Sequence, residues 1–219
     1  MYNRMTVDTN GLLMYHVLRS GPILVVGAGV IGSQRAALSM RTGAMVRVVD
    51  PELRDDVEGH ERFKRGFIPE DLNGVSLAFV STNYPEVNRE VARLARQKHI
   101  PVNVADVPEL CDFYLPALVQ RGNLVIGIST KGGCPGYAAY VRRRLTPVVD
   151  ESWGQALEVL ACARRWSKGQ PNGQAWRQVS MDLLIECCAH DDMDRVNELL
   201  SDALGAGVTL KTIGARWGE

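Results

Sequence analysis

The sequence predicts an α/β protein with a mainly parallel sheet, followed by a β-hairpin and a helical C-terminal part. Short apolar runs of strand length alternate with helical segments between residues 22 and 104, which is typical of parallel strands buried on both faces. Two further strand-like runs flank a tight turn at 121–123 and indicate a hairpin. We therefore expect three regions, at residues 1–112, 113–150 and 151–219.

In the first region, strands and helices alternate as they do in doubly wound sheets. The expected elements, in chain order, are a strand at 22–26, a glycine turn and a helix ending at Gly43, a strand closing on Asp50, a short strand near 62–67, one helical turn at 69–72, a strand at 75–81, a helix at 85–99 and a strand at 101–104. Parallel strands of this kind bind ligands at their carboxyl ends, so we expect the site there.

The rest of the chain breaks this alternation. The runs FYLPALVQ (113–120) and LVIGIST (124–130) are expected to form an antiparallel pair. A hairpin of this size is not stable by itself, so we expect it to pack against a larger body such as a second copy of the chain. Helical segments are expected from Pro135 to about Trp166, after a break at 169–173 to about Cys188, and over 192–207.

The turn after the first strand reads Gly27-Ala28-Gly29-Val30-Ile31-Gly32. In a dinucleotide site, Gly27 permits the tight turn, Gly29 lets the backbone approach a pyrophosphate, and Gly32 lets the helix pack closely on the sheet. The N–H groups at the start of the helix, from Val30 and Ile31 onwards, can bind phosphate oxygens. With a strand before it and a helix after it, the motif predicts a Rossmann fold with a nicotinamide dinucleotide.

The acidic residue at the end of the second strand indicates which dinucleotide binds. Asp50 lies about twenty residues beyond the glycine motif, at the position that accepts hydrogen bonds from the adenosine ribose hydroxyls. Its negative charge would repel a 2′-phosphate. We therefore expect NAD rather than NADP.

Polar residues also follow the later strands of the predicted sheet. Ser81, Thr82 and Asn83 come after the third long apolar run, where we expect them on the nicotinamide side of the cofactor. An ordinary helix cap by Thr82 or Asn83 is an equally good reading, and both can hold together. Asp106 follows the last strand of the region and is expected in the same crevice.

Charge and composition argue against several classes of protein. Lys and Arg number 25 and so do Asp and Glu, so the overall charge gives no reason to expect nucleic-acid binding. The five cysteines are odd in number and lack metal-ligand spacing, which favours a reduced, cytoplasmic protein without a disulfide framework or a metal site. No run approaches the roughly 20 apolar residues of a membrane span, and we expect a soluble protein without a signal peptide.

Two consecutive segments, VNVADVPELCDFYLPALVQRGNLVIGIST (102–130) and KGGCPGYAAYVRRRL (131–145), resemble the precorrin-2 dehydrogenase family, which also forms the dehydrogenase and ferrochelatase part of siroheme synthases. The residues that carry the resemblance are Asn103, Asp106, Pro108, Phe113, Pro116, Arg121, Ser129 and Pro135. The resemblance implies a Rossmann domain, a homodimer built on the hairpin, and C-terminal helices that help enclose a tetrapyrrole.

The resemblance also implies the reaction, which is the NAD-dependent oxidation of precorrin-2 to sirohydrochlorin. NAD accepts the hydride, because protein side chains cannot. Asp106 is the acid that the family motif supplies and our candidate for the catalytic group. Whether it acts as a general base, a metal ligand or an orienting charge stays open, and so does the alternative that it caps a turn before Pro108.

The substrate is a polycarboxylate, so its site needs cations and hydrogen-bond donors. Asn103, Ser129, Thr130, Lys131 and Arg142 are the candidate substrate-binding residues. Because successive helical residues point about 100° apart, the three arginines of the RRR run cannot all face one pocket.

Two rival functions stay open at this point. An NAD-sensing regulatory module of the kind attached to potassium transporters shares the glycine turn and the acid, although such modules continue with βαβ repeats. A dehydrogenase of the same fold that acts on another substrate is the second rival, because fold does not fix function. Metal chelation is a separate question, and we favour a dehydrogenase without it.

Overall fold

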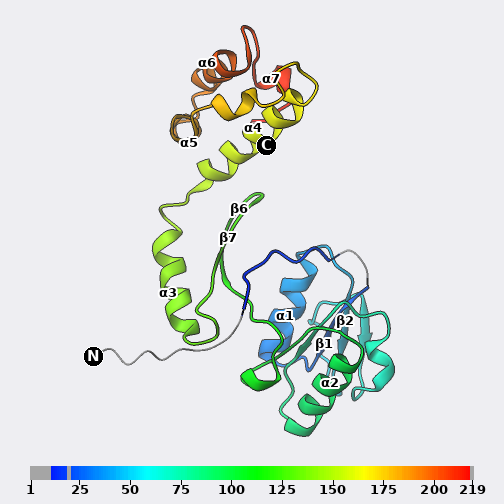
Figure 1. Cartoon of the computed structure of the whole chain (residues 1–219). Helices are drawn as coiled ribbons and strands as arrows, with labels where there is room; N and C mark the ends of the chain where they lie inside the picture. The colour runs from blue at the N-terminus through cyan, green and yellow to red at the C-terminus, as the bar shows by residue number, and fades with distance from the viewer. Residues whose placement is uncertain (1–10, 19–20, 218–219) are drawn as a thin grey trace, which may run out of the picture. The chain divides into compact units, whose positions relative to one another are not determined.

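The computed structural model describes residues 11–18 and 21–217 (Figure 1). The chain divides into two compact units, Met1–Leu115 and Pro116–Glu219, and each is described by itself. The first unit is α/β with a parallel sheet, and the second is a hairpin followed by helices. The predicted fold class is therefore confirmed.

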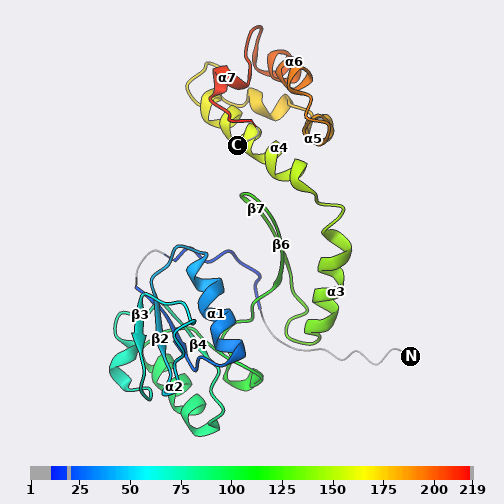
Figure 2. The ribbon, with the colours of Figure 1, turned by 180° about the vertical axis from the view of Figure 1, so that it is seen from behind.

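The first unit is built on five parallel strands in the order β3-β2-β1-β4-β5. Its elements are β1 (Ile23–Val26), α1 (Val30–Met40), β2 (Val46–Val49), β3 (Glu61–Phe63), the 3₁₀ helix η1 (Pro69–Leu72), β4 (Leu77–Val80), α2 (Pro85–Gln97), β5 (Val102–Val104) and the 3₁₀ helix η2 (Pro108–Leu110). Figure 2 shows β2, β3 and β4 from behind, with α1 beside them. The strand order reverses between β1 and β4, and such a switch point is where doubly wound sheets bind ligands.

Both faces of this sheet are covered. In β1, Leu24 and Val26 join a buried cluster with α2, whereas Ile23 and Val25 join a second cluster that includes Ala36 of α1. This arrangement explains why the strand reads as a continuous apolar run rather than an alternating one. In the observed register, Val26 pairs with Val49 of β2 and with Val80 of β4, so these strands end at the same edge of the sheet.

The strand expected near 62–67 is shorter than predicted, because β3 ends at Phe63. The buried carboxylate of Asp71 explains the difference. It accepts two hydrogen bonds from the guanidinium of Arg65, at 2.7 and 2.8 Å, and one from the N–H of Ile68 at 2.9 Å. These bonds fold the chain into a loop directly after β3. The helical turn expected at 69–72 is confirmed as η1.

The second unit begins with the predicted hairpin, in which β6 pairs antiparallel with β7. Its elements are β6 (Ala117–Arg121), β7 (Leu124–Ile128), α3 (Pro135–Leu145), α4 (Glu151–Ser167), the 3₁₀ helix η3 (Ala175–Gln178), α5 (Met181–Ala189), α6 (Met193–Leu204) and α7 (Leu210–Ile213). The helical stretch expected up to about Trp166 is two helices. Asp150 starts the second of them, because its carboxylate accepts the N–H of Ser152 at 3.0 Å.

Burial is uneven within the second unit. Helices α4 to α7 share a core that includes Val159, Leu184 and Leu200. In the hairpin and α3, by contrast, the buried residues are Val119 and Ala138. The helices thus have a core of their own, whereas the hairpin and α3 do not.

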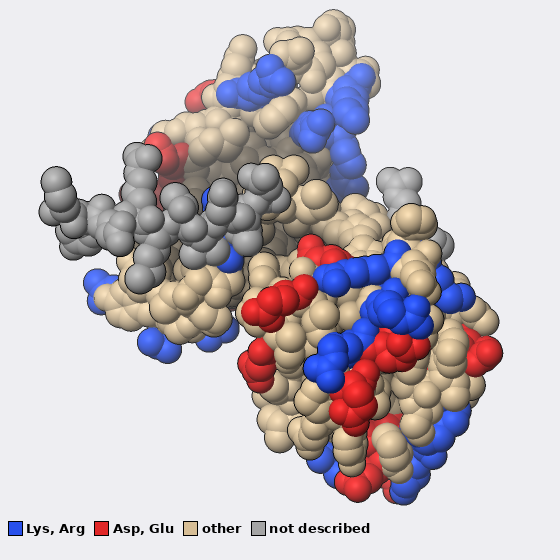
Figure 3. Space-filling view, turned by 60° about the horizontal axis from the view of Figure 1, so that its bottom comes forward, with Lys and Arg blue, Asp and Glu red and all other residues tan. Residues whose placement is uncertain are grey.

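The described residues contain no helix that is both long and apolar enough to span a membrane. In the lower right part of Figure 3, basic and acidic side chains lie next to each other. This mixture agrees with the balance of 25 basic and 25 acidic residues in the sequence.

Candidate functional site

The glycine turn between β1 and α1 is closed to larger side chains at two positions. Gly27 has a φ of +89°, and a Cβ there would lie 2.6 Å from the carbonyl oxygen of Ser81. A Cβ on Gly32 would lie 1.8 Å from the carbonyl oxygen of Gly27. The first glycine therefore permits the turn and the third permits close packing of α1, as the motif predicts.

Gly29 has a different environment. It is exposed, its φ is −65°, and a Cβ there would meet no described atom within 4 Å. Gly29 is the N-cap of α1, and within the described chain no side chain caps this helix and no acidic residue lies in its first turn. The first N–H groups of α1, including those of Val30 and Ile31, have no helical carbonyl to bond. Open space over a glycine beside such N–H groups fits the pyrophosphate of a dinucleotide.

Asp50 lies directly beside this turn. Its Oδ2 accepts the N–H of Ala28 at 2.5 Å, and its Oδ1 accepts the N–H of Glu52 at 2.6 Å. A carboxylate oxygen has two lone pairs, so each oxygen can still accept a ribose hydroxyl. Asp50 therefore ties the end of β2 to the glycine turn, a role that the sequence analysis did not predict.

Ser81, Thr82 and Asn83 follow β4 at the same edge of the sheet. The Ser81 hydroxyl donates to the carbonyl of Gly27 at 3.1 Å. The Thr82 hydroxyl accepts the N–H of Tyr84 at 3.1 Å and also bonds the side chain of Asn88. The expectation that Thr82 or Asn83 is the N-cap of α2 is wrong. The N-cap is Tyr84, because Pro85 occupies the first helical position.

Asp106 follows β5 at the same edge and is exposed. Its φ of +58° lies in the left-handed region, which Asp tolerates better than most residues. Within the part of the chain that the structure describes, its carboxylate has no hydrogen bond and no ion pair. The carboxylate does not cap the turn before Pro108, so that alternative is wrong and the group is free to meet a ligand.

Asn103 lies on β5 and holds the segment by which the chain leaves the sheet. Its side-chain N–H donates to the carbonyl of Phe113 at 2.9 Å. The Cys111 thiol makes a similar tie, because it donates to the carbonyl of Val104 at 3.1 Å. Burial raises the pKa of Cys111, so the sulfur remains a protonated donor at neutral pH. The sequence offered no signal for the role of this cysteine.

The candidate residues of the second unit lie in the loop between β7 and α3 and on α3 itself. The Ser129 hydroxyl accepts the N–H of Lys131, and the Thr130 hydroxyl accepts the N–H of Cys134, each at 3.1 Å. Lys131 is exposed and has a φ of +53°. The two hydroxyls thus shape a tight loop that presents the Lys131 side chain to solvent.

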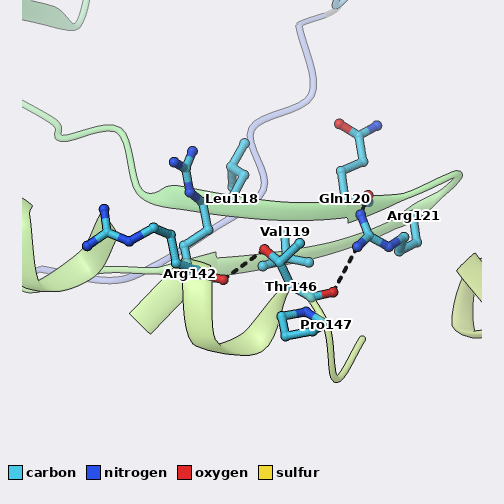
Figure 4. A pocket seen from close by; sticks show the side chains of 8 residues that line it. Leu118, Val119, Gln120, Arg121, Arg142, Thr146 and Pro147 are labelled. Carbon is cyan, nitrogen blue, oxygen red and sulfur yellow. Dashed lines mark hydrogen bonds between the residues drawn. The ribbon is translucent and has the colours of Figure 1, made fainter. Parts of the chain in front are cut away.

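Arg142 lines a groove between β6 and the end of α3 (Figure 4). The lining residues are Leu118, Val119, Gln120, Arg121, Arg142, Arg143, Thr146 and Pro147. Arg144 does not line it, which agrees with the expectation that the three arginines diverge. Arg121 is held in place, because it donates to the carbonyl of Thr146 at 2.9 Å and pairs with Glu151 at 3.3 Å.

Among the described residues, no group of three or more His, Cys, Asp or Glu lies close enough to hold a metal ion. The residues of the first unit, by contrast, fit a dinucleotide: Gly29 leaves open space, α1 offers unpaired N–H groups, and the Asp50 carboxylate lies beside the turn. Residues 14–117 match a family described as putative NAD(P)-binding. The cofactor expectation is thereby supported.

Siroheme synthases are similar to this chain in sequence. The protein from Methylobacillus flagellatus is 36% identical over 186 residues, which cover 80% of this chain and 40% of the relative. The protein from Stutzerimonas stutzeri is 30% identical over 214 residues, which cover 93% of this chain and 46% of the relative. The chain thus spans less than half the length of these curated relatives.

A solved structure, SirC, a precorrin-2 dehydrogenase, has a similar fold. It matches with a TM-score of 0.60 and 26% sequence identity, over 87% of this chain and 97% of SirC. The second unit therefore has a counterpart as well, since the match extends well beyond residues 14–117. The resemblance inferred from the sequence is confirmed, and the chain is related to the siroheme synthases and to precorrin-2 dehydrogenase.

Proposed function

We propose that the chain catalyses the NAD-dependent oxidation of precorrin-2 to sirohydrochlorin. One observation carries the proposal: the Asp106 carboxylate is exposed and free of partners at the sheet edge that also holds the glycine turn. An acid at this place can accept a proton from a substrate bound next to a nicotinamide. The names of the related proteins, siroheme synthase and precorrin-2 dehydrogenase, support the same reaction.

The residues of the first unit have different roles in the proposed reaction. NAD supplies the hydride acceptor when it is bound. Gly29 and the N–H groups of Val30 and Ile31 bind the pyrophosphate, and Asp50 accepts the ribose hydroxyls. Asp106 takes up the proton that leaves the substrate.

The residues of the second unit bind the anionic side arms of the substrate. Lys131 and Arg142 carry charges that no described acidic residue neutralises. Ser129 and Thr130 hold the loop that presents Lys131, and their hydroxyls can still donate a hydrogen bond. Asn103 of the first unit keeps its side-chain oxygen for the substrate, because its N–H donates to Phe113.

A single assay tests the proposal. The purified chain is incubated anaerobically with precorrin-2 and NAD, and the absorbance of sirohydrochlorin is followed. We expect product to form only when both compounds are present, and at a lower rate with NADP. Binding of NAD without turnover would contradict the proposal and favour the sensor.

Ferrous or cobaltous ion is then added to the same cuvette to test chelation. We propose a dehydrogenase that does not insert metal, so the sirohydrochlorin spectrum should change no faster with the protein than in a protein-free control. Faster metal insertion would show the second activity.

We further propose that the chain works as a homodimer through the hairpin and α3. Exposed apolar side chains support this surface: Leu118 and Val125 are each 39% exposed, Tyr137 is 60% exposed and Tyr140 is 49% exposed. Each strand of the two-stranded sheet also leaves one edge unpaired within the described chain, and such edges are sites of strand addition. A cytoplasmic location fits the five unpaired cysteines.

A further inference from the structure

Arg35 lies over the buried ring of Phe79. It lies in the second turn of α1, and its guanidinium carbon is 5.8 Å from the centre of the Phe79 ring. Phe79 is only 3% exposed and packs edge-on against Phe113, with 5.6 Å between the ring centres. The guanidinium is therefore partly removed from water by apolar neighbours.

Within the described residues, the guanidinium of Arg35 has no hydrogen bond and no ion pair. Burial lowers the pKa of Arg35, and no carboxylate opposes that effect. The pKa values of Arg54, Arg65 and Arg93 are all raised, in each case first by a hydrogen bond to a neighbouring carboxylate. Since a desolvated cation costs free energy unless an anion accompanies it, Arg35 lacks the partner that other arginines of this unit have.

The place of Arg35 indicates where that partner comes from. Side chains of a helix lean toward its N-terminus, and the N-terminus of α1 is at the cofactor turn. Phe79 is the last residue but one of β4, directly before Val80 and Ser81. The guanidinium therefore lies beside the carboxyl end of β4, on the α1 face of the sheet. The nicotinamide side of the cofactor is expected at the same strand end.

We propose that Arg35 binds a carboxylate of the tetrapyrrole substrate and so orients the macrocycle against the nicotinamide. This inference rests on the proposed function. A guanidinium presents a planar fork of N–H donors that matches a carboxylate, and an apolar floor such as Phe79 strengthens the pairing by excluding water. The cofactor itself does not need this cation, because the N–H groups of α1 already serve its phosphates.

Three variants of the full chain test the proposal. Arg35→Met keeps an apolar stem over Phe79 and removes the charge, whereas Arg35→Lys keeps a charge without the fork. Arg41→Met is the matched control, because Arg41 is exposed at the other end of the same helix. The measurements are the KM for precorrin-2, the kcat, and the dissociation constant of NAD in the absence of tetrapyrrole.

We expect Arg35→Met to raise the KM for precorrin-2 by about 10- to 100-fold, the loss typical of one charge-assisted pair. The KM of Arg35→Lys should lie between those of Arg35→Met and the wild type, and the KM of Arg41→Met should equal that of the wild type. The dissociation constant of NAD should change by less than about twofold in all three variants. An unchanged KM in Arg35→Met would overturn the proposal, and so would an equal loss of NAD affinity, which would assign Arg35 to the cofactor.

A binding experiment separates this inference from the proposed reaction. Sirohydrochlorin, which is fluorescent and carries the same carboxylates, is titrated anaerobically into each variant without NAD. Tighter binding to the wild type than to Arg35→Met supports the role of Arg35 even if the wild type turns over no precorrin-2. Equal binding to both proteins would overturn the role of Arg35 while leaving the reaction itself intact.

Discussion

The first unit and the hairpin with α3 bury their side chains to very different extents. All four residues of β1, Ile23–Val26, are buried, and they contribute to clusters on both faces of the sheet. Strands β6 and β7 together bury Val119 alone, and α3 buries Ala138 alone. The cofactor residues therefore belong to a unit with its own hydrophobic core. Lys131 and Arg142, by contrast, belong to a segment that has to pack against another surface to be stable.

This difference separates two kinds of site. Backbone groups at the ends of buried strands are held in place before any ligand arrives, which suits a cofactor common to many enzymes. Long cationic side chains on an exposed segment gain order only when they meet an anion. We therefore expect changes in the first unit to affect chemistry and cofactor binding, and changes in the hairpin to affect assembly.

The change with the largest expected effect is Asp106→Asn. It should lower kcat by about 100- to 10,000-fold, the usual contribution of a general acid or base. Asn tolerates the left-handed backbone at this position, so the melting temperature and the NAD affinity should not change. Thermal melts, NAD titration and turnover measure the three quantities. Asp55→Asn, an exposed site on the same unit, is the control, and wild-type turnover in Asp106→Asn would remove Asp106 from the mechanism.

A pair of glycine variants separates folding from cofactor binding within one turn. Gly32→Ala should lower the free energy of unfolding by about 2 kcal/mol or more, because its Cβ would lie 1.8 Å from the Gly27 carbonyl. Gly29→Ala should leave stability unchanged within about 0.5 kcal/mol, because nothing described lies near its Cβ. It should nevertheless weaken NAD at least tenfold. Chemical denaturation and NAD titration are the readouts, and normal NAD binding by Gly29→Ala would contradict the pyrophosphate position.

The stability of the first unit should also depend on pH through Asp71. Burial raises the pKa of Asp71, but the hydrogen bonds from Arg65 and from the Ile68 N–H, together with the charges of Arg65 and Arg47, hold it below the usual range. A lowered folded-state pKa means that the stabilisation is present above about pH 4 and is lost as the pH falls through the folded value.

Asp71→Asn should therefore lower the free energy of unfolding by about 2 kcal/mol at pH 7. This is less than for a fully buried ion pair, because Arg65 is partly exposed. Urea unfolding at pH 7 and pH 3 measures the difference in stability between the wild type and Asp71→Asn. This difference should be smaller at pH 3. A difference of the same size at both values would show that the charge is not its cause. Asp56→Asn, at an exposed pair, should have no measurable effect.

Among these variants, Leu118→Asp in the hairpin should have the smallest effect on the stability of the monomer. A charge on this exposed apolar surface should weaken self-association at least tenfold and leave the unfolding of the first unit as it is. Light scattering over a concentration series measures the association. Asn123→Asp at the exposed hairpin tip is the control. A chain that is monomeric before the change, or equally dimeric after it, would contradict the homodimer.

The elements that the sequence predicted well are those with a local pattern. The apolar run of β1 and the glycine spacing of residues 27–32 each specify a conformation from adjacent residues alone. The end of β3 and the break between α3 and α4 at 146–150 were harder to predict from the sequence. The first depends on Asp71 binding Arg65 across six residues, and the second on Asp150 capping α4 where apolar spacing suggests a continuous helix.

The sequence by itself determined the fold class, the dinucleotide turn and the presence of an acid after β5, because spacing and residue type are enough for each. Only the tertiary structure decided that Asp50 bonds the Ala28 N–H, that the Asp106 carboxylate is free, and that Arg35 lies over Phe79 without an anion. These facts depend on which distant residues the sheet brings together. Ala28 meets Asp50, 22 positions away, because β1 and β2 pair in register, and Arg35 meets Phe79, 44 positions away, because α1 packs on the sheet; no local pattern records either arrangement.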